Sequence, residues 1–335
     1  MTGRGHRLDL QAAPFLHTTL STPRLMVEVI LCTLPVLAAA TWFFGVVALL
    51  VVAAATAGAV FAEWALATRA PRGNTLRDGS GVLTGLLVGL TLPPAIPLWM
   101  AALGGFVAIA LGKQLFGGLG QNLFNPALVG RAFLQAAFPG ALTTWGAPRG
   151  FLDVPASTFA LPFLHGGLDG MSTATPLALH KFEHTTTGLW ALFSGDVAGS
   201  LGETSALVLL LVGLWLGLRR AFDWRIPVAI LVATALLGGA LHLLDPVRNP
   251  GPLFLLTSGG LLFGAVFMAT DPVSSPTTPR GALAFGAGIG ALVVVIRDYG
   301  GLPEGVMYAI LLMNAATPLL ERVSQPRPFG RRRAA

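Results

Sequence analysis

Cysteine and charged residues are scarce in this sequence. Its 335 residues include one cysteine, Cys32, which excludes an intramolecular disulfide, a cysteine-ligated iron–sulfur cluster and a structural zinc site. Charged residues make up 11% of the chain, against about 25% in an ordinary soluble domain, which excludes a soluble enzyme or a disordered tail. Any redox chemistry therefore depends on a bound cofactor.

Apolar residues, in contrast, are abundant. Hydrophobic residues make up 54% of the chain, and the mean hydropathy is +0.72. The long apolar runs are interrupted by Gly and Pro rather than by charge, which is typical of a protein that lies in a lipid bilayer. Residues 1–24 contain no apolar run of signal-peptide length, so we expect the first apolar segment to be retained as a membrane anchor.

The basic residues follow a membrane pattern rather than a nucleic-acid-binding one. The net charge is +6, but the arginines and lysines lie between apolar segments and in the tail at 331–333. Membrane topology uses basic residues at such positions. We therefore expect contact with membrane lipid and none with nucleic acid.

Ten apolar segments are candidates for membrane-spanning helices, which need about 20 residues to cross. They are 25–45, 46–67, 81–97, 98–116, 123–138, 203–218, 225–244, 253–270, 281–296 and 305–320. The third, fifth and eighth are short or bounded by proline-rich sequence, so broken or half-length helices are expected there. The sequence thus predicts an all-α integral membrane protein with about ten transmembrane helices.

The distribution of basic residues predicts the orientation of these spans. With both termini in the cytoplasm, 16 of the 21 lysines and arginines fall on the cytoplasmic side. This arrangement makes 1–24 a cytoplasmic segment and 321–335 a basic cytoplasmic tail. It places the long loop 139–202 on the external or periplasmic face.

The spans show signs of an internal repeat. Residues 79–94 are similar to residues 257–272, since each is a helix rich in small residues that ends in a Thr-x-Pro break. The sequence therefore divides into a first five-helix repeat, 25–138, and a second, 203–320. Because five is odd, the second repeat enters the membrane from the opposite side, which is an inverted repeat. The alternative is that glycine-rich apolar helices resemble one another by composition alone.

Ionisable residues inside spans are costly and therefore informative. Glu28 and Glu63 lie in the first two spans, Arg131 in the fifth, and Asp271 at the break of the eighth. Each is a candidate for an ion or flavin pathway or for a buried ion pair. The plainer alternatives are an interfacial position for Glu28 and Glu63 and a helix-capping role for Asp271.

Residues 117–120 form a glycine-rich turn between the fourth and fifth spans. The turn follows a membrane helix rather than a strand and lacks the dinucleotide-binding spacing. A hinge or a backbone-lined cavity is the better interpretation, and Asn122 and Asn125 are candidates to supply amide groups to it. The histidines show no metal-ligand spacing, so no metal site is expected.

The external loop contains a candidate phosphate-binding turn. Pro176 is a favoured first residue of a helix, which makes Thr175 its N-cap. We expect the Thr175 hydroxyl and the adjacent N–H groups to face outward, where they could bind a phosphate. From the residues alone, an ordinary capped turn is the stronger interpretation.

A resemblance to a known family changes that interpretation. The order Asp169-x-x-Ser172-x-Ala174-Thr175, followed by Pro176, resembles the signature at which a flavin transferase attaches FMN, through its phosphate, to a threonine. The chain is similar to the family of RnfD, a membrane component of the Rnf ion-translocating electron-transport complex, and of its relative in the sodium-pumping NADH:quinone oxidoreductase. Further matching segments are 13–17, 117–127 and 267–276.

The resemblance implies a function. It implies FMN linked covalently to Thr175, a second, non-covalent riboflavin, and electron transfer within a complex that couples ferredoxin and NAD oxidation–reduction to Na⁺ or H⁺ movement. The chain has no nicotinamide-binding fingerprint and no cysteine ligands, so we expect it to act only with membrane and peripheral subunits that carry iron–sulfur clusters and flavin. The flavin transferase is implied as a maturation partner. In one departure, Thr173 stands where the family usually has Gly.

A channel or transporter for a small solute is the alternative function. Inverted five-helix repeats with broken helices are also a transporter architecture. A covalent flavin distinguishes the two, because it leaves a fluorescent band on a denaturing gel.

The predicted topology can be tested by cysteine labelling. After Cys32 is replaced, single cysteines introduced within 139–202 should react with a membrane-impermeant reagent in intact cells, because this loop lies outside. Labelling only after the membrane is permeabilised would contradict the predicted orientation.

Overall fold

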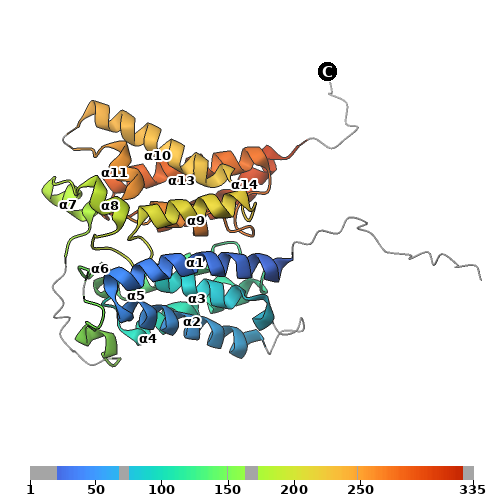
Figure 1. Ribbon diagram of the computed structural model, residues 1–335. Coiled ribbons are helices and arrows are strands. Elements are labelled where there is room, and N and C mark those ends of the chain that lie inside the picture. Colours follow the sequence, from blue (N-terminus) through green and yellow to red (C-terminus); the bar gives the residue numbers. More distant parts are fainter. Residues whose placement is uncertain (1–20, 68–74, 149, 163–172, 247, 327–335) are drawn as a thin grey trace, which may run out of the picture.

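The computed structural model describes the chain except for residues 1–20, 68–74, 149, 163–172, 247 and 327–335. Every regular element within the described ranges is helical, as expected. The helices form two bundles that lie against each other, one from each half of the chain (Figure 1). The connecting segment lies at the end of the molecule opposite to the start of α1 and the end of α14.

The first bundle consists of five helices and two short 3₁₀ turns. Helix α2 packs on α3 and α4, and α4 packs on α5. The elements are α1 (Thr22–Phe44), α2 (Val46–Ala67), η1 (Thr75–Asp78), α3 (Ser80–Leu90), α4 (Leu98–Gly112), η2 (Gln114–Phe116) and α5 (Pro126–Ala137).

The second bundle repeats this order of packing. Helix α10 packs on α11 and α13, and α13 packs on α14. Its elements are α9 (Ala206–Leu218), α10 (Arg225–Leu244), α11 (Pro252–Thr257), α12 (Leu261–Phe263), η4 (Gly264–Met268), α13 (Pro279–Tyr299) and α14 (Val306–Ser324). The segment between the bundles contains α6 (Pro139–Thr143), η3 (Ala156–Phe159), α7 (Pro176–Glu183) and α8 (Leu189–Ser194).

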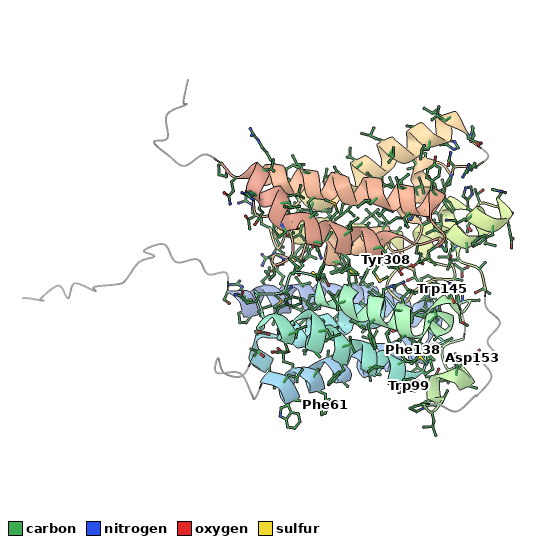
Figure 2. All side chains as sticks on the ribbon, turned by 180° about the vertical axis from the view of Figure 1, so that it is seen from behind. Phe61, Trp99, Phe138, Trp145, Asp153 and Tyr308 are labelled. Carbon is green, nitrogen blue, oxygen red and sulfur yellow. The ribbon has the colours of Figure 1, made fainter. Side chains whose placement is uncertain are left out.

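Within the described ranges, six helices are long and apolar enough to cross a membrane. They are Thr22–Phe44, Val46–Leu66, Leu98–Phe116, Arg225–Leu244, Pro279–Tyr299 and Val306–Ser324. Together with the shorter apolar helices, they show a multi-pass membrane protein. Large side chains such as Phe61 on α2 point outward, as expected for a surface in contact with lipid (Figure 2).

Helices occur at all ten predicted positions, and the third, fifth and eighth are short or broken as expected. The predicted boundaries of these three were too wide. Helix α3 ends at Leu90 rather than at residue 97, because Pro93 and Pro94 cannot continue it. Helix α5 begins at Pro126, where the side chain of Asn125 accepts a hydrogen bond from the Ala127 N–H at 2.9 Å.

The eighth predicted span, 253–270, is divided in the middle. Helix α11 ends at Thr257, and the chain turns through Gly259, whose φ of +63° is a conformation that glycine adopts readily. The chain then continues as α12 and the π-helical turn η4. The sixth span is also shorter than predicted, since α9 begins at Ala206 and not at 203. This leaves Glu203 in a loop outside the helix.

The first helices of the two bundles run antiparallel. Glu28, near the start of α1, forms an ion pair of 2.7 Å with Arg219, which follows the end of α9. At their other ends, Phe43 of α1 lies beside the loop that precedes α9. Opposite directions of equivalent helices are what an inverted repeat requires, while the relation between the complete repeats stays a prediction.

Small residues allow α2 and α4 to approach closely. A Cβ atom at Gly58 of α2 would overlap the carbonyl oxygen of Ala102, and one at Gly105 of α4 would overlap that of Ala55. Close packing of this kind is typical of helix pairs in membranes, where lipid gives no hydrophobic driving force between helices.

This contact generates a stability prediction. Gly58→Ala should destabilise the folded protein by about 1–3 kcal/mol through overpacking, despite the higher helix propensity of alanine. Gly217→Ala in α9 is the matched control, because no atom lies within 4 Å of the added Cβ. Thermal unfolding in detergent checks both variants. Equal unfolding temperatures for the two would contradict the close α2–α4 contact.

Candidate functional site

Thr175 is the N-cap of α7, as the sequence predicted. Its Oγ1 accepts a hydrogen bond from the Ala178 N–H at 3.2 Å, and Pro176 occupies the first helical turn. Thr173, two residues earlier, donates from its Oγ1 to the Trp145 carbonyl oxygen at 3.2 Å. Ala174 is exposed and Pro176 is buried, whereas Asp169 and Ser172 lie outside the described residues.

The expected outward orientation of Thr175 is wrong. The residue is only 3% exposed, because α7 folds back onto the second bundle. Its side chain lines a small cavity together with Glu203, Thr204, Gly259 and Glu304. The threonine therefore faces the boundary between the two bundles rather than bulk solvent.

Lys181 holds α7 in this position. Its ammonium group donates hydrogen bonds to three carbonyl oxygens. One belongs to Arg297 in the last turn of α13, at 2.7 Å, and the other two to Gly300 at 2.5 Å and Leu302 at 3.2 Å, which follow the helix. Burial lowers the pKa of Lys181, while the nearby Asp298 carboxylate opposes this change. A cation at the carboxyl end of α13 is also favoured by the helix dipole. Helix α7 is thus fixed to the α13–α14 connection.

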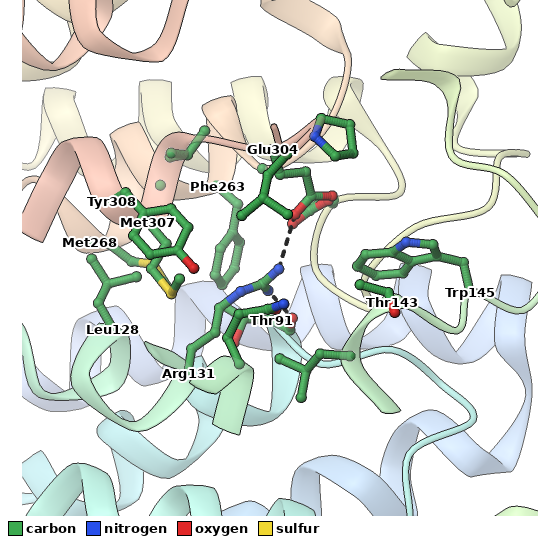
Figure 3. A pocket seen from close by; sticks show the side chains of 18 residues that line it. Thr91, Leu128, Arg131, Thr143, Trp145, Phe263, Met268, Glu304, Met307 and Tyr308 are labelled. Carbon is green, nitrogen blue, oxygen red and sulfur yellow. Dashed lines mark hydrogen bonds and ion pairs between the residues drawn. The ribbon is translucent and has the colours of Figure 1, made fainter. Parts of the chain in front are cut away.

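Buried arginines occupy the carboxyl ends of both broken helices. Arg131 of α5 donates to the carbonyl oxygen of Thr91, directly after α3, and to Glu304 Oε2 at 3.0 Å (Figure 3). Arg297 of α13 donates to the carbonyl oxygens of Leu255 at 2.7 Å and Ser258 at 3.0 Å, at the end of α11. Each guanidinium satisfies carbonyl groups that a helix of normal length would pair internally.

Glu203 lies between the two helix breaks. The preceding residues bond to the end of α3, with the Gly202 N–H donating to Leu90 O at 2.6 Å and the Leu201 N–H to Leu92 O at 3.1 Å. On the other side, Glu203 faces the α11–α12 break, where a Cβ at Gly260 would lie 2.7 Å from its Oε1. The loop that carries Glu203 therefore contacts both halves of the chain, and its carboxylate lies on the side of the α11–α12 break.

Two carboxyl groups, those of Glu203 and Glu304, line the Thr175 cavity, and Glu203 is the one without a partner of opposite charge in direct contact. Among the described residues it forms no ion pair, since the guanidinium of Arg131 binds Glu304 and that of Arg297 binds carbonyl oxygens. Burial, and next the Glu304 carboxylate, raise the pKa of Glu203 from its ordinary value of 4.5 to about 7. The positive charges of Arg131 and Arg297 and the nearby Ser200 hydroxyl oppose that rise.

A second, larger cavity adjoins the Thr175 cavity at Glu203 and Glu304. It lies between the bundles and combines the Arg131–Glu304 ion pair with aromatic and sulfur-containing side chains (Figures 2 and 3). These side chains are Trp145, Phe263, Met268, Met307 and Tyr308. The combination of flat apolar walls with a few fixed polar groups is typical of a cofactor pocket. We call this space the interbundle cavity.

Three of the predicted pathway residues meet in a separate cavity, near the start of α1. The Nδ2 of Asn122 donates to Asp271 Oδ2 at 3.4 Å, and the Nδ2 of Asn125 donates to Met268 O at 3.1 Å. The lining also includes Lys113 and Met26. Gly117, Gly118 and Gly120, which precede it, all have positive φ, so the glycine-rich segment forms the turn that brings these groups together.

Glu63 and Glu28 have different surroundings. Glu63 forms a buried ion pair with Lys113, whose Nζ also donates to Ser80 Oγ at 2.5 Å, and both side chains of the ion pair are 1% exposed. Glu63 thus adjoins the asparagine-lined cavity through Lys113. Glu28 pairs instead with Arg219 at the α1–α9 contact and does not line this cavity.

Sequence reasoning missed Glu203, Glu304 and Arg297 as members of the site. The sequence pattern places Glu203 in a span and Arg297 among the external basic residues. One feature of the sequence could have identified them: a charged residue within an apolar segment usually has a buried partner or a function. Their partners lie far away in the chain, so the sequence did not show which groups would meet.

Comparison with known proteins gives a consistent result. Residues 9–330 match the family model described as the NQR2, RnfD, RnfE family. The chain is 45% identical to the D component of the ion-translocating oxidoreductase complex of Stutzerimonas stutzeri, with 93% of each chain covered. It is 40% identical to the D component of the proton-translocating ferredoxin:NAD(+) oxidoreductase complex of Clostridium ljungdahlii, with 97% of this chain and 96% of the relative covered. The resemblance found in the sequence is therefore confirmed.

The unpaired carboxyl of Glu203 predicts a pH-dependent stability. Because folding raises its pKa from 4.5 to about 7, its contribution to stability is lost as the pH rises through this range. The side chain of the Glu203→Gln variant cannot ionise. As the pH rises to about 7, the unfolding temperature of this variant should therefore increase relative to that of the wild type, and the difference should stay constant at higher pH. This difference in unfolding temperature should be about 2–4 °C for each kcal/mol of stability that the wild type loses when the buried carboxyl ionises.

Thermal unfolding in detergent across this pH range measures the effect. Asp196→Asn is the control, because Asp196 lies in the same loop and is exposed. Parallel curves for Glu203→Gln and the wild type would contradict the assignment.

Proposed function

The chain belongs to the NQR2, RnfD, RnfE family, and on this basis we propose that it is an electron-transfer subunit of an ion-translocating oxidoreductase complex, with FMN attached to Thr175. Its relatives are named as the D components of such complexes. The complex would work in a bacterial cytoplasmic membrane, with both termini of this chain in the cytoplasm.

The observation that carries the proposal is the position of Thr175. Its hydroxyl caps α7 beside a cavity that adjoins the larger interbundle cavity. Gly199 and Gly259 line the first cavity without side chains that would fill it. The amino-terminal end of α7 and its helix dipole suit a phosphate at this point. The residues present therefore fit a flavin that is linked through its phosphate.

Attachment would need an activated flavin nucleotide and the flavin transferase. A bond forms between Thr175 Oγ1 and the flavin phosphorus, while the anhydride bond from that phosphorus to the leaving phosphate breaks. The hydroxyl proton leaves with the displaced phosphate or passes to solvent. No oxidation or reduction occurs, and the product is a phosphodiester with one negative charge.

The protein would position the flavin and exclude water from it, while the flavin ring supplies the one- and two-electron chemistry. Trp145, Tyr308 and Phe263 offer flat apolar surfaces in the interbundle cavity, and Arg131 offers a fixed positive charge. A positive charge near a flavin favours its reduced form. These side chains would hold the ring and tune its reduction.

The separate cavity near the start of α1 is the proposed place for the non-covalent riboflavin. Asn122, Asn125 and Asp271 give it amide and carboxylate groups that suit the hydroxyl groups of a ribityl chain. Electrons would then pass between this chain and partner subunits that carry iron–sulfur clusters and flavin. The direction of flow and the identity of the coupled ion are properties of the complete complex.

Substitution of Thr175 tests the proposal. Thr175→Ala should abolish covalent FMN, because the phosphoester needs the hydroxyl oxygen, and should cost about 0.5–2 kcal/mol of stability through the lost cap. In-gel flavin fluorescence and intact mass measure attachment after coexpression with the transferase. Thermal unfolding checks that the variant is folded.

Thr173→Ala is the matched control, since it loses only the hydrogen bond to Trp145 and should keep the flavin. Retention of FMN by Thr175→Ala, together with its loss from Thr173→Ala, would move the site by two residues. A wild-type chain without flavin would instead support the transporter alternative.

A further inference from the structure

Two carboxyl groups line the Thr175 cavity, and their negative charges disfavour a further anion there. Glu203 and Glu304 both line it beside the threonine. Of these two carboxylates, Glu304 is paired with Arg131 at 3.0 Å, while Glu203 forms no ion pair within the described ranges. A phosphodiester on Thr175, as proposed above, would add an anion to a buried space that already holds an unpaired carboxylate.

Without the phosphodiester, the charges of Glu203 and of the groups that face it sum to zero when both carboxyl groups are ionised. The groups that face it are Glu304 from the α13–α14 connection, Arg131 from α5, Arg297 from α13 and the Ser200 hydroxyl of its own loop. The guanidinium groups carry two positive charges, and the carboxylates, if both are ionised, carry two negative charges. One further negative charge leaves the cluster with a net charge of −1 in a region of low dielectric constant, which is costly.

We propose that Glu203 takes up one proton when Thr175 becomes linked to FMN, so that the phosphodiester shares its cavity with a neutral carboxylic acid. This inference rests on the proposed attachment at Thr175. Proton uptake restores the charge balance at the group that has no cationic partner. It also converts Glu203 into a hydrogen-bond donor, and a phosphodiester oxygen could accept that hydrogen bond.

A proton suits this position better than a metal cation. A sodium ion at Glu203 would bring a full positive charge close to the guanidinium groups of Arg131 and Arg297, which both face this carboxyl group. The carbonyl oxygens at the breaks, which could coordinate a cation in a broken-helix site, are occupied by these same guanidinium groups. A proton on Glu203 neutralises the excess charge without adding a new cation beside them.

Infrared difference spectroscopy of the full chain in lipid nanodiscs tests the inference. The probe is the C=O stretching band of a protonated carboxyl group, assigned to Glu203 by its loss in Glu203→Gln. The band is followed against pH in wild-type protein with and without FMN, and gel fluorescence and mass establish how much FMN is attached. Neither readout depends on electron-transfer activity.

The expected result is that the midpoint pH of the band rises by about one unit or more when FMN is attached, which is a tenfold increase in proton affinity. Asp196→Asn, in the same loop but exposed, should keep the band and its shift. Glu304→Gln should lower the midpoint in both forms, because it removes the carboxylate beside Glu203. This second variant assigns the band independently if Glu203→Gln does not fold.

Failure of the inference and failure of the proposed function give different results. A chain that carries FMN but shows the same midpoint as the FMN-free chain overturns the inference and leaves the proposed function intact. Absence of the protonated band from the FMN-carrying chain across the pH range, or a band whose midpoint falls as the sodium concentration rises, also overturns it in favour of a bound metal cation. A chain that carries no FMN after treatment with the transferase overturns the proposed function and this inference with it.

Discussion

The interaction on which the rest of the structure depends is the capping of broken helices by buried arginines. Helices α3 and α11 stop inside the molecule, and their last carbonyl groups have no partner within the helix. In a membrane protein no water replaces those hydrogen bonds, so each unpaired group would cost several kcal/mol. Arg131 and Arg297 supply the missing donors.

This arrangement also brings acidic groups into the interior. The charge of Arg131 is balanced by Glu304, which lies 173 residues away in the other half of the chain. The loop of Glu203 contacts backbone near both breaks, and among the described residues Glu203 pairs with neither arginine. The boundary between the bundles is therefore a charged centre in an otherwise apolar protein, and the interbundle cavity forms around it.

Thr175 reaches this centre through the same part of the second bundle. The Lys181 ammonium fixes α7 to carbonyl oxygens at the end of α13 and beyond, and the nearby Arg297 caps α11. Glu304 lies in the same connection between α13 and α14. Helix α7, which carries the proposed flavin site, is therefore bonded to the same segment of the second bundle that supplies Glu304 to the contact between the halves.

Much of the architecture could be predicted from the sequence because its causes are local. Apolar runs predict membrane helices, prolines and glycines predict where they break, and the Thr175-Pro176 pair predicts a helix cap. Of the five residues that the sequence suggested for a cavity or an ion or flavin pathway, Asn122, Asn125 and Asp271 line one cavity, whereas Glu28 and Glu63 do not line it.

The tertiary structure alone decided which charges meet. Glu304 and Arg297 are separated from the groups that they bind by 39 to 173 residues, and their contacts follow from how the helices pack. The burial of Thr175 has the same origin, since it depends on where α7 docks and not on the residues that form its cap. Local sequence determines hydrogen bonds within a turn, whereas the electrostatics of a buried site is a sum over groups that only the fold brings together.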